Sequence, residues 1–303
     1  MQNPGLKNWL LLILLGLIWG GSFLAVSYAL EGFGPITIAA VRIAIGAVIV
    51  TAASILLGHG LPSFVTAEGR RTWVFALGMA LFTNAIPFSL LSWAQQHVSS
   101  GYAGITMAVV PLLVLPLSHY LVPGHRLTPV KTFGFFVGFA GVVILIGPAQ
   151  ILQSGGSDIE NVARLAAVGA SACYAIGSII TRLSPQGPLL AFSSAALILA
   201  SVILLPVALV AEGMPAMPEP RALLGLLYLG VVPTALATVI LVFVIKSAGP
   251  AFMSLVNYQV PVWAVIFGMV FLGESLPASF LWALGLILVG LAISQARLAR
   301  FRL

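Results

Sequence analysis

Few polar side chains interrupt the long apolar stretches of this 303-residue chain, and these side chains are the groups that could do chemistry. The amides of Asn84 and Asn257 each lie near the middle of such a stretch. An amide in hydrocarbon is costly to leave unpaired, so we expect both amides to face a protein interior. There they could bind the carboxylate or ammonium of a zwitterion, or they could only hydrogen-bond neighbouring helices. With hydroxyl and aromatic side chains at similar depth, they give a candidate substrate-binding set of Trp19, Ser22, Asn84, Tyr102, Thr106, Tyr174, Ser178, Thr234, Asn257 and Tyr258.

Prolines also lie within these stretches, and a proline inside a helix removes one helical hydrogen bond. The carbonyl that is freed could coordinate a substrate ammonium, and the kink could act as a hinge. A static kink is the alternative for any one of them. We expect gating or hinge roles for Pro87, Pro111, Pro233 and Pro261.

Arg42 is the one charge well inside an apolar stretch. It could attract an anionic group, or pair with Glu31 or with free carbonyls. No Asp or Glu lies near the centre of a stretch, so the carboxylate relay typical of proton-coupled antiport is missing, as is an anionic site for a drug cation. We therefore expect a neutral or zwitterionic substrate. The sequence contains neither a phosphate-binding loop nor a nucleophile–base or metal-ligand constellation, so it predicts no enzymatic activity and no cofactor.

The composition shows which solvent surrounds these groups. Charged residues make up 7% of the chain and hydrophobic residues 60%, with a mean hydropathy of +1.14. Soluble domains carry roughly 25% charged residues, so a water-soluble domain is excluded, and an apolar chain of this kind is not disordered. The single Cys173 excludes a disulfide framework. The net charge of +6 comes from scattered residues, which predicts a lipid bilayer as partner and no nucleic acid.

Ten segments are long enough to cross the hydrocarbon core, which takes about 20 residues. They are 9–30, 35–57, 72–94, 100–122, 129–148, 161–183, 188–210, 221–245, 250–272 and 278–297. With the N-terminus in the cytoplasm, ten of the thirteen basic residues fall inside and six of the seven acidic residues outside. This sorting predicts that both termini are cytoplasmic.

The chain reads as two copies of one pattern. Gly141 follows Gly124 by seventeen residues and Gly290 follows Gly273 by the same distance, while prolines interrupt corresponding spans of both halves. We predict repeats at 1–150 and 155–303, each of five spans. Because five is odd, the two repeats are inverted relative to each other, as in many secondary transporters. The predicted fold is therefore an all-α membrane protein of ten transmembrane helices in two inverted five-helix repeats.

Three motifs resemble the drug/metabolite transporter superfamily, EamA type. They are Trp19-Gly20-Gly21-Ser22, Arg42 after Pro35, and Gly273-Glu274-Ser275-Leu276 before a glycine-rich last span. The resemblance covers all ten spans. The first repeat departs from the pattern at His125, where the family usually has Glu, and the second lacks the Trp-Gly pair and the Arg. The overall pattern is most similar to the bacterial aromatic amino acid exporter group. The resemblance implies a secondary transporter of the bacterial inner membrane, and a structural or gating charge at Arg42.

We therefore expect a transporter that exports amino acids, aromatic and other neutral ones above all, by alternating access through a central midplane cavity. An exporter of other small neutral metabolites or drugs is the alternative, and an integral membrane enzyme acting on a lipid is a distant one. The oligomeric state stays open, because the small-residue face of Gly134 and Gly138 could pack the repeats together or dimerise the chain.

Overall fold

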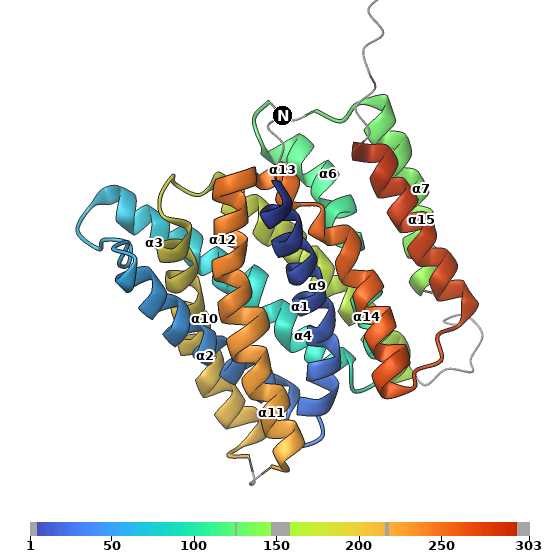
Figure 1. The fold of residues 1–303 in the computed structure, drawn as a ribbon, viewed down its shortest axis with the longest axis horizontal. Helices are drawn as coiled ribbons and strands as arrows, with labels where there is room; N and C mark the ends of the chain where they lie inside the picture. Colours follow the sequence, from blue (N-terminus) through green and yellow to red (C-terminus); the bar gives the residue numbers. More distant parts are fainter. Residues whose placement is uncertain (1–4, 125, 147–157, 216–217, 296–303) are drawn as a thin grey trace, which may run out of the picture.

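A computed structural model describes residues 5–124, 126–146, 158–215 and 218–295 (Figure 1). The regular structure of these residues is helical, with no β-strand among them. Seven helical segments are long and apolar enough to cross a membrane: Gly5–Ala29, Pro35–Leu56, Ala67–Ala94, Ser100–Leu121, Ile159–Leu183, Leu189–Glu212 and Pro220–Ala248. Three shorter apolar helices, Pro129–Leu145, Val256–Leu272 and Ala278–Ser294, coincide with the three other predicted spans. The all-α membrane fold is thereby confirmed, while the predicted ends at 148 and 297 lie outside the described residues.

Six spans are single helices. They are α1 (Gly5–Ala29), α2 (Pro35–Leu56), α7 (Pro129–Ile146), α9 (Asp158–Leu183), α10 (Leu189–Glu212) and α15 (Ala278–Gln295). Continuous helix is expected here because a backbone that crosses lipid must satisfy its own hydrogen bonds. Proline begins α2 without cost, since the first N–H groups of a helix have no partner within it.

The third and eighth spans each contain a π-helical turn in their middle. The third runs from α3 (Ala67–Met79) through η1 (Ala80–Ala85) into α4 (Ile86–Ala94). The eighth runs from α11 (Pro220–Leu229) through η2 (Gly230–Leu236) into α12 (Ala237–Ala248). Pro87 lies just after η1 and Pro233 lies within η2, where the missing N–H interrupts the α-helical ladder. Such turns are rare in proteins, but those that occur are often found at functional sites.

The fourth and ninth spans are broken outright. α5 (Ser100–Thr106) ends after 7 residues, and α6 (Val109–Leu121) follows it. α13 (Pro250–Met253) has only 4 residues before the break that leads into α14 (Val256–Leu272). Pro111 lies in the first turn of α6, whereas Pro261 lies inside α14. The two breaks therefore differ in depth along their spans.

Helices from the two halves of the chain lie against each other throughout the bundle. α1 packs on α14, α2 on α10, and α9 on α4 and α6, while α7 and α15 form a pair on one flank (Figure 1). In that pair the backbones approach closely, because a Cβ at Gly290 would collide with the backbone of Gly134 and Gly138. The small-residue face of α7 thus packs against the last span of the same chain. The largest buried apolar cluster lies mainly among α1, α5, α14 and α15.

Two glutamates tie span ends together on one side of the bundle. Glu212, at the end of α10, accepts hydrogen bonds at 2.9 and 2.8 Å from two backbone N–H groups in the first turn of α2. Glu274, between α14 and α15, accepts 2.6 and 2.9 Å bonds from the first two N–H groups of α5. The N-cap of α2 is Gly34, which has no side chain to do this. A carboxylate is stabilising here because it meets the positive end of the helix dipole.

Candidate functional site

Arg42 lies at the centre of a small cluster in the middle of the bundle. Its side chain projects from α2 and is only 6% exposed. The Nε–H donates a hydrogen bond to Thr234 Oγ1 of η2 at 3.3 Å, and the guanidinium lies 4.0 Å from the ring centroid of Phe88. The pairing with Glu31 that the sequence left open is not formed, because Glu31 lies 3.7 Å from Arg221. Arg42 is therefore held by a hydroxyl and an aromatic face.

Phe88 connects this cluster to the sixth span. Its ring, on α4, meets the ring of Tyr174 on α9 edge-on, with the centroids 6.4 Å apart. One turn further along α9, a Cβ at Gly177 would collide with the hydroxyl of Thr83 in η1. The structure thus brings Thr234 and Tyr174, both predicted site residues, close to Arg42 from separate spans.

Trp19 joins the first span to the π turn of the eighth. Its indole Nε1–H donates a hydrogen bond to the carbonyl of Pro233 at 3.1 Å. Ser22 bonds within its own helix, donating to the Trp19 carbonyl at 2.6 Å. The glycines beside Trp19 serve packing, because a Cβ at Gly20 would lie 2.5 Å from the Cβ of Trp263. The Trp-Gly-Gly-Ser motif therefore combines a polar tether with a close helix contact.

Asn84 and Thr234 make equivalent hydrogen bonds in the two π turns. Each is the fifth residue of its turn, and each side chain donates to the carbonyl five residues earlier. Asn84 Nδ2 bonds the Met79 carbonyl at 3.2 Å, and Thr234 Oγ1 bonds the Leu229 carbonyl at 2.7 Å. Both side chains are buried, at 6% and 4% exposed. The prediction paired the prolines of these spans, whereas the geometry pairs these two polar residues.

Thr106 lies at the break of the fourth span. Its carbonyl accepts a hydrogen bond at 2.7 Å from Ser171 of α9, and its own hydroxyl donates to the Ala103 carbonyl at 2.6 Å. Tyr102 lies one turn earlier, 1% exposed, with its ring 5.2 Å from that of Phe280. That places Tyr102 near the Glu274 cap and apart from the Arg42 cluster.

The other predicted residues are spread more widely. Asn257 and Tyr258 are half-buried in the first turn of α14. Their neighbour Gln259 faces α1, where its side chain lies against Gly16. Ser178 is exposed and donates to the Tyr174 carbonyl at 2.8 Å. The structure does not bring these three predicted residues into contact with Arg42.

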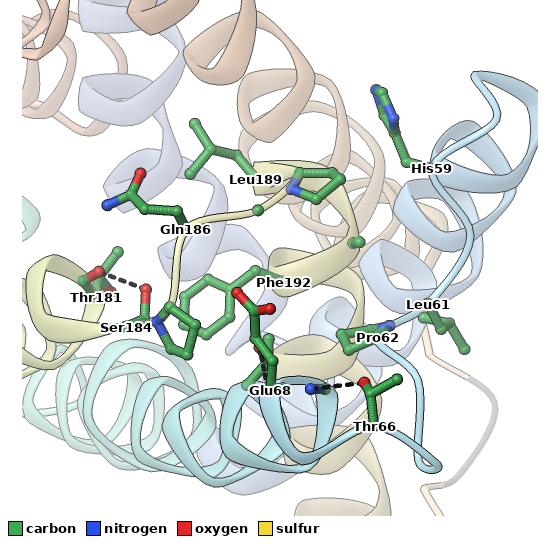
Figure 2. Close-up of a pocket in the computed structure, with 16 residues that line it drawn as sticks. His59, Leu61, Pro62, Thr66, Glu68, Thr181, Ser184, Gln186, Leu189 and Phe192 are labelled. Atoms are coloured by element: carbon green, nitrogen blue, oxygen red, sulfur yellow. Dashed lines mark hydrogen bonds between the residues drawn. The ribbon is translucent and has the colours of Figure 1, made fainter.

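Two hollows occur near the bundle surface. A pocket of about 290 Å³ lies at the end of the bundle where the α2–α3 and α9–α10 loops meet, and Figure 2 shows the Glu68 carboxylate pointing into it. A wider apolar groove of about 600 Å³ runs between α1, α11 and α14, past Tyr228 and Phe267. Neither lining includes a predicted substrate-binding residue.

Sequence reasoning missed the helix-capping roles of Glu212 and Glu274. Their partners lie 173 to 176 residues away in the sequence, so no local pattern pairs them. A usable signal was present in the chain: α2 begins after Gly34, which cannot cap a helix with a side chain. A helix start without its own cap has to obtain one from elsewhere.

Comparison with known proteins gives one family. The profile described as the EamA-like transporter family matches residues 7–147 and again 162–295. The uncharacterized inner membrane transporter YedA of Escherichia coli (strain K12) is 27% identical over 287 residues, covering 93% of this chain and 88% of that protein. An uncharacterized transporter of Archaeoglobus fulgidus is 26% identical over 296 residues, covering 95% and 98% of the two chains.

A third relative is similar over most of its length, and one solved structure has a similar fold. Protein PecM of Dickeya dadantii is 25% identical over 282 residues, covering 92% of this chain and 89% of that protein. A protein crystal structure with 22% sequence identity superimposes with a TM-score of 0.67, over 95% of this chain and 97% of the other. The two proteins share a fold.

Proposed function

The chain belongs to the EamA-like transporter family, and from that membership we propose that it exports amino acids, aromatic and other neutral ones above all, by alternating access. Membership of the family makes it a multi-pass membrane transporter; we propose amino acids as its substrates and alternating access as its mechanism. The observation that carries the mechanism is the pair of π turns halfway along the third and eighth spans, each fastened by a buried polar side chain.

The proposed architecture is two inverted repeats of five spans, at 1–150 and 155–303. Support comes from the family profile, which matches the chain twice, and from the helix contacts. The first span packs on the ninth, and the sixth packs on the fourth. In the proposed repeats the first span corresponds to the sixth and the fourth to the ninth, so these two contacts are equivalent. In transporters with such repeats, the substrate site lies near the midplane between them.

The proposed site centres on the Arg42 cluster and the two π turns. Trp19, Phe88 and Tyr174 supply aromatic surface there, and Asn84 and Thr234 supply polar groups. No carboxylate from the described residues reaches this region, since Glu212 and Glu274 cap helices at one end of the bundle. A site of this composition favours a zwitterion with an apolar side chain over a drug cation.

The proposed location is the bacterial inner membrane, with both termini cytoplasmic. A relative is named an inner membrane transporter, and the basic residues sort to one side of the ten spans. The acidic caps Glu212 and Glu274 would then lie on the periplasmic side, and the pocket lined by Glu68 would open to the cytoplasm.

Proteoliposomes test the proposal. Vesicles that contain the purified protein are loaded with labelled phenylalanine, tyrosine or leucine, and efflux is compared with that of protein-free vesicles. We expect efflux that unlabelled amino acids accelerate by exchange. Substituting Asn84 or Asn257 by Ala should lower it while folded protein is retained.

Absence of efflux over a broad panel of amino acids would contradict the proposal. The alternative is an exporter of other small neutral metabolites or drugs. If sugars, nucleosides or neutral drugs compete for efflux better than amino acids do, that alternative holds.

A further inference from the structure

We propose that Arg42 is the binding site for the carboxylate of the transported solute. The inference rests on the proposed function and deepens it, because it makes a free carboxylate a requirement for transport. The family resemblance in the sequence implies a structural or gating role for this charge. The surroundings of the side chain favour a ligand.

Arg42 is buried without a carboxylate partner among the described residues. The acidic side chains that the structure describes are all placed elsewhere. Glu31 lies near Arg221, Glu160 pairs with Arg164, and Glu212 and Glu274 cap helices, while Glu68 lines the pocket at the loops and Glu219 directly precedes α11. A charge at membrane depth that lacks a counter-charge is costly, and such residues usually serve function. The missing negative charge is what a zwitterionic solute would bring.

The guanidinium is held in a way that keeps its hydrogen-bonding edge available. The guanidinium carbon lies over the Phe88 ring, 4.0 Å from its centroid, and Thr234 accepts a hydrogen bond from the Nε–H. A cation–π contact uses no hydrogen-bond acceptor, so it does not replace a partner for the two terminal nitrogens. These nitrogens can therefore bind a carboxylate with two parallel hydrogen bonds while the contact with Phe88 persists.

The neighbouring groups suit the rest of an amino acid. The Thr83 hydroxyl is enclosed and has no hydrogen-bond partner within the part of the chain that the structure describes. It lies against Gly177, one turn along α9 from Tyr174, whose ring meets Phe88. An unused buried hydroxyl is expensive unless something binds it. The solute class that fits is a free amino acid whose aromatic or apolar side chain lies against Phe88 and Tyr174.

The test compares phenylalanine with phenylalaninamide, which has the same side chain and ammonium but no carboxylate. Each compound is loaded into the proteoliposomes together with labelled phenylalanine, so that it competes with the label on the same side of the membrane, and the slowing of labelled efflux is measured. We expect the wild-type protein to bind the amide roughly 10- to 100-fold more weakly, because a charge-assisted bidentate contact is lost. Comparable competition by the two compounds would overturn the inference, and this arm needs no variant.

The variants Arg42→Gln and Arg42→Lys then identify the residue. In Arg42→Gln the preference for phenylalanine over phenylalaninamide should shrink to within about threefold. Arg42→Lys should keep part of the preference, because Lys has the charge but cannot make the bidentate contact of a guanidinium. A structural role would instead lower the efflux of labelled phenylalanine and leave the ratio of the two compounds' competition unchanged. Arg221→Gln is the matched control, since Arg221 lies at a span end and should leave the ratio as in the wild type.

The outcomes separate the two proposals. If the wild-type protein moves no amino acid, the proposed function fails and this inference with it. If it moves phenylalanine, and either discriminates poorly against the amide or keeps its discrimination in Arg42→Gln, only the role of Arg42 fails. Should Arg42→Gln not fold, as judged by detergent size-exclusion chromatography, the wild-type ratio and Arg42→Lys still decide the question.

Discussion

The indole of Trp19 donates its N–H to the backbone carbonyl of Pro233 at 3.1 Å, which joins the first span to the π turn of the eighth. A carbonyl in a proline-containing turn readily accepts from outside its own helix, because proline disrupts the α-helical ladder around it. Together with the bond from Arg42 of α2 to Thr234, this contact ties an unbroken helix directly to the π turn η2.

Substituting Trp19 by Phe should therefore slow transport while the fold is kept. An aromatic ring remains, but the N–H is lost together with the five-membered part of the indole, and the control variant below undergoes the same loss of volume. Hydrogen bonds between membrane helices are worth about 0.6 to 1.7 kcal/mol, so if this bond exists in only one state of the cycle, efflux should change roughly three- to eighteen-fold. Trp282→Phe is the control, because Trp282 is 74% exposed on α15. Equal efflux in the two variants would contradict a role for the tether.

Thr234→Val should affect transport more than Thr238→Val. Thr234 fastens η2 through the Leu229 carbonyl and also accepts from Arg42, whereas Thr238 donates to the carbonyl four residues earlier, as in an ordinary α-helix. We expect Thr234→Val to lose about 1 kcal/mol of stability and most of its efflux, with Thr238→Val close to wild type. Melting in detergent and efflux from proteoliposomes measure the two effects.

Glu274→Gln should lower the melting temperature of the protein. It removes the charge and one acceptor from the start of α5, and losing a cap of this kind costs about 0.5 to 2 kcal/mol. Glu212→Gln should act in the same way at α2. The control is Glu219→Gln, because Glu219 precedes α11 without a side-chain cap bond. A Glu219→Gln variant as unstable as the other two would show that charge alone, and not capping, is responsible.

Gly290→Ala should destabilise the pair α7 and α15. The added methyl group would meet the backbone of Gly134 and Gly138, which cannot move aside as a side chain can. Overpacking of this kind typically costs about 1 to 3 kcal/mol. Gly285→Ala lies on the same helix with nothing within 4 Å of its added Cβ, and should be neutral or stabilising. If the two variants have the same melting temperature, the close approach of the two backbones does not matter for stability.

The spans could be read from the sequence because lipid imposes a simple rule on their length and polarity. The ten predicted segments coincide with the helices to within a few residues wherever the ends are described. The prolines were a weaker guide: Pro87 and Pro233 lie at the two π turns, whereas Pro261 lies inside α14 and Pro206 lies inside the unbroken α10. Apolar length and backbone chemistry are properties of short segments, which is why they can be predicted from the sequence alone.

The partners of the polar groups could not be predicted in the same way. The sequence predicts that Asn84 faces a substrate or another helix, yet its amide bonds the Met79 carbonyl in its own helix. Arg42 meets Thr234 across 192 residues of sequence, and Glu274 meets α5 across 174 and 173. Such contacts depend on how the helices pack, and local periodicity does not contain that information.

The two π turns also give their spans a way to change shape without unwinding. A π turn holds one residue more than an α-helical turn. Returning it to α geometry would therefore rotate the rest of the helix by about 100° about its axis and translate it by about 1.5 Å along that axis. If the extra residue migrated along the span by exchanging carbonyl partners, only the stretch that it passed would rotate. The third and eighth spans could thus present a different face to the passing solute while both of their ends stayed fixed.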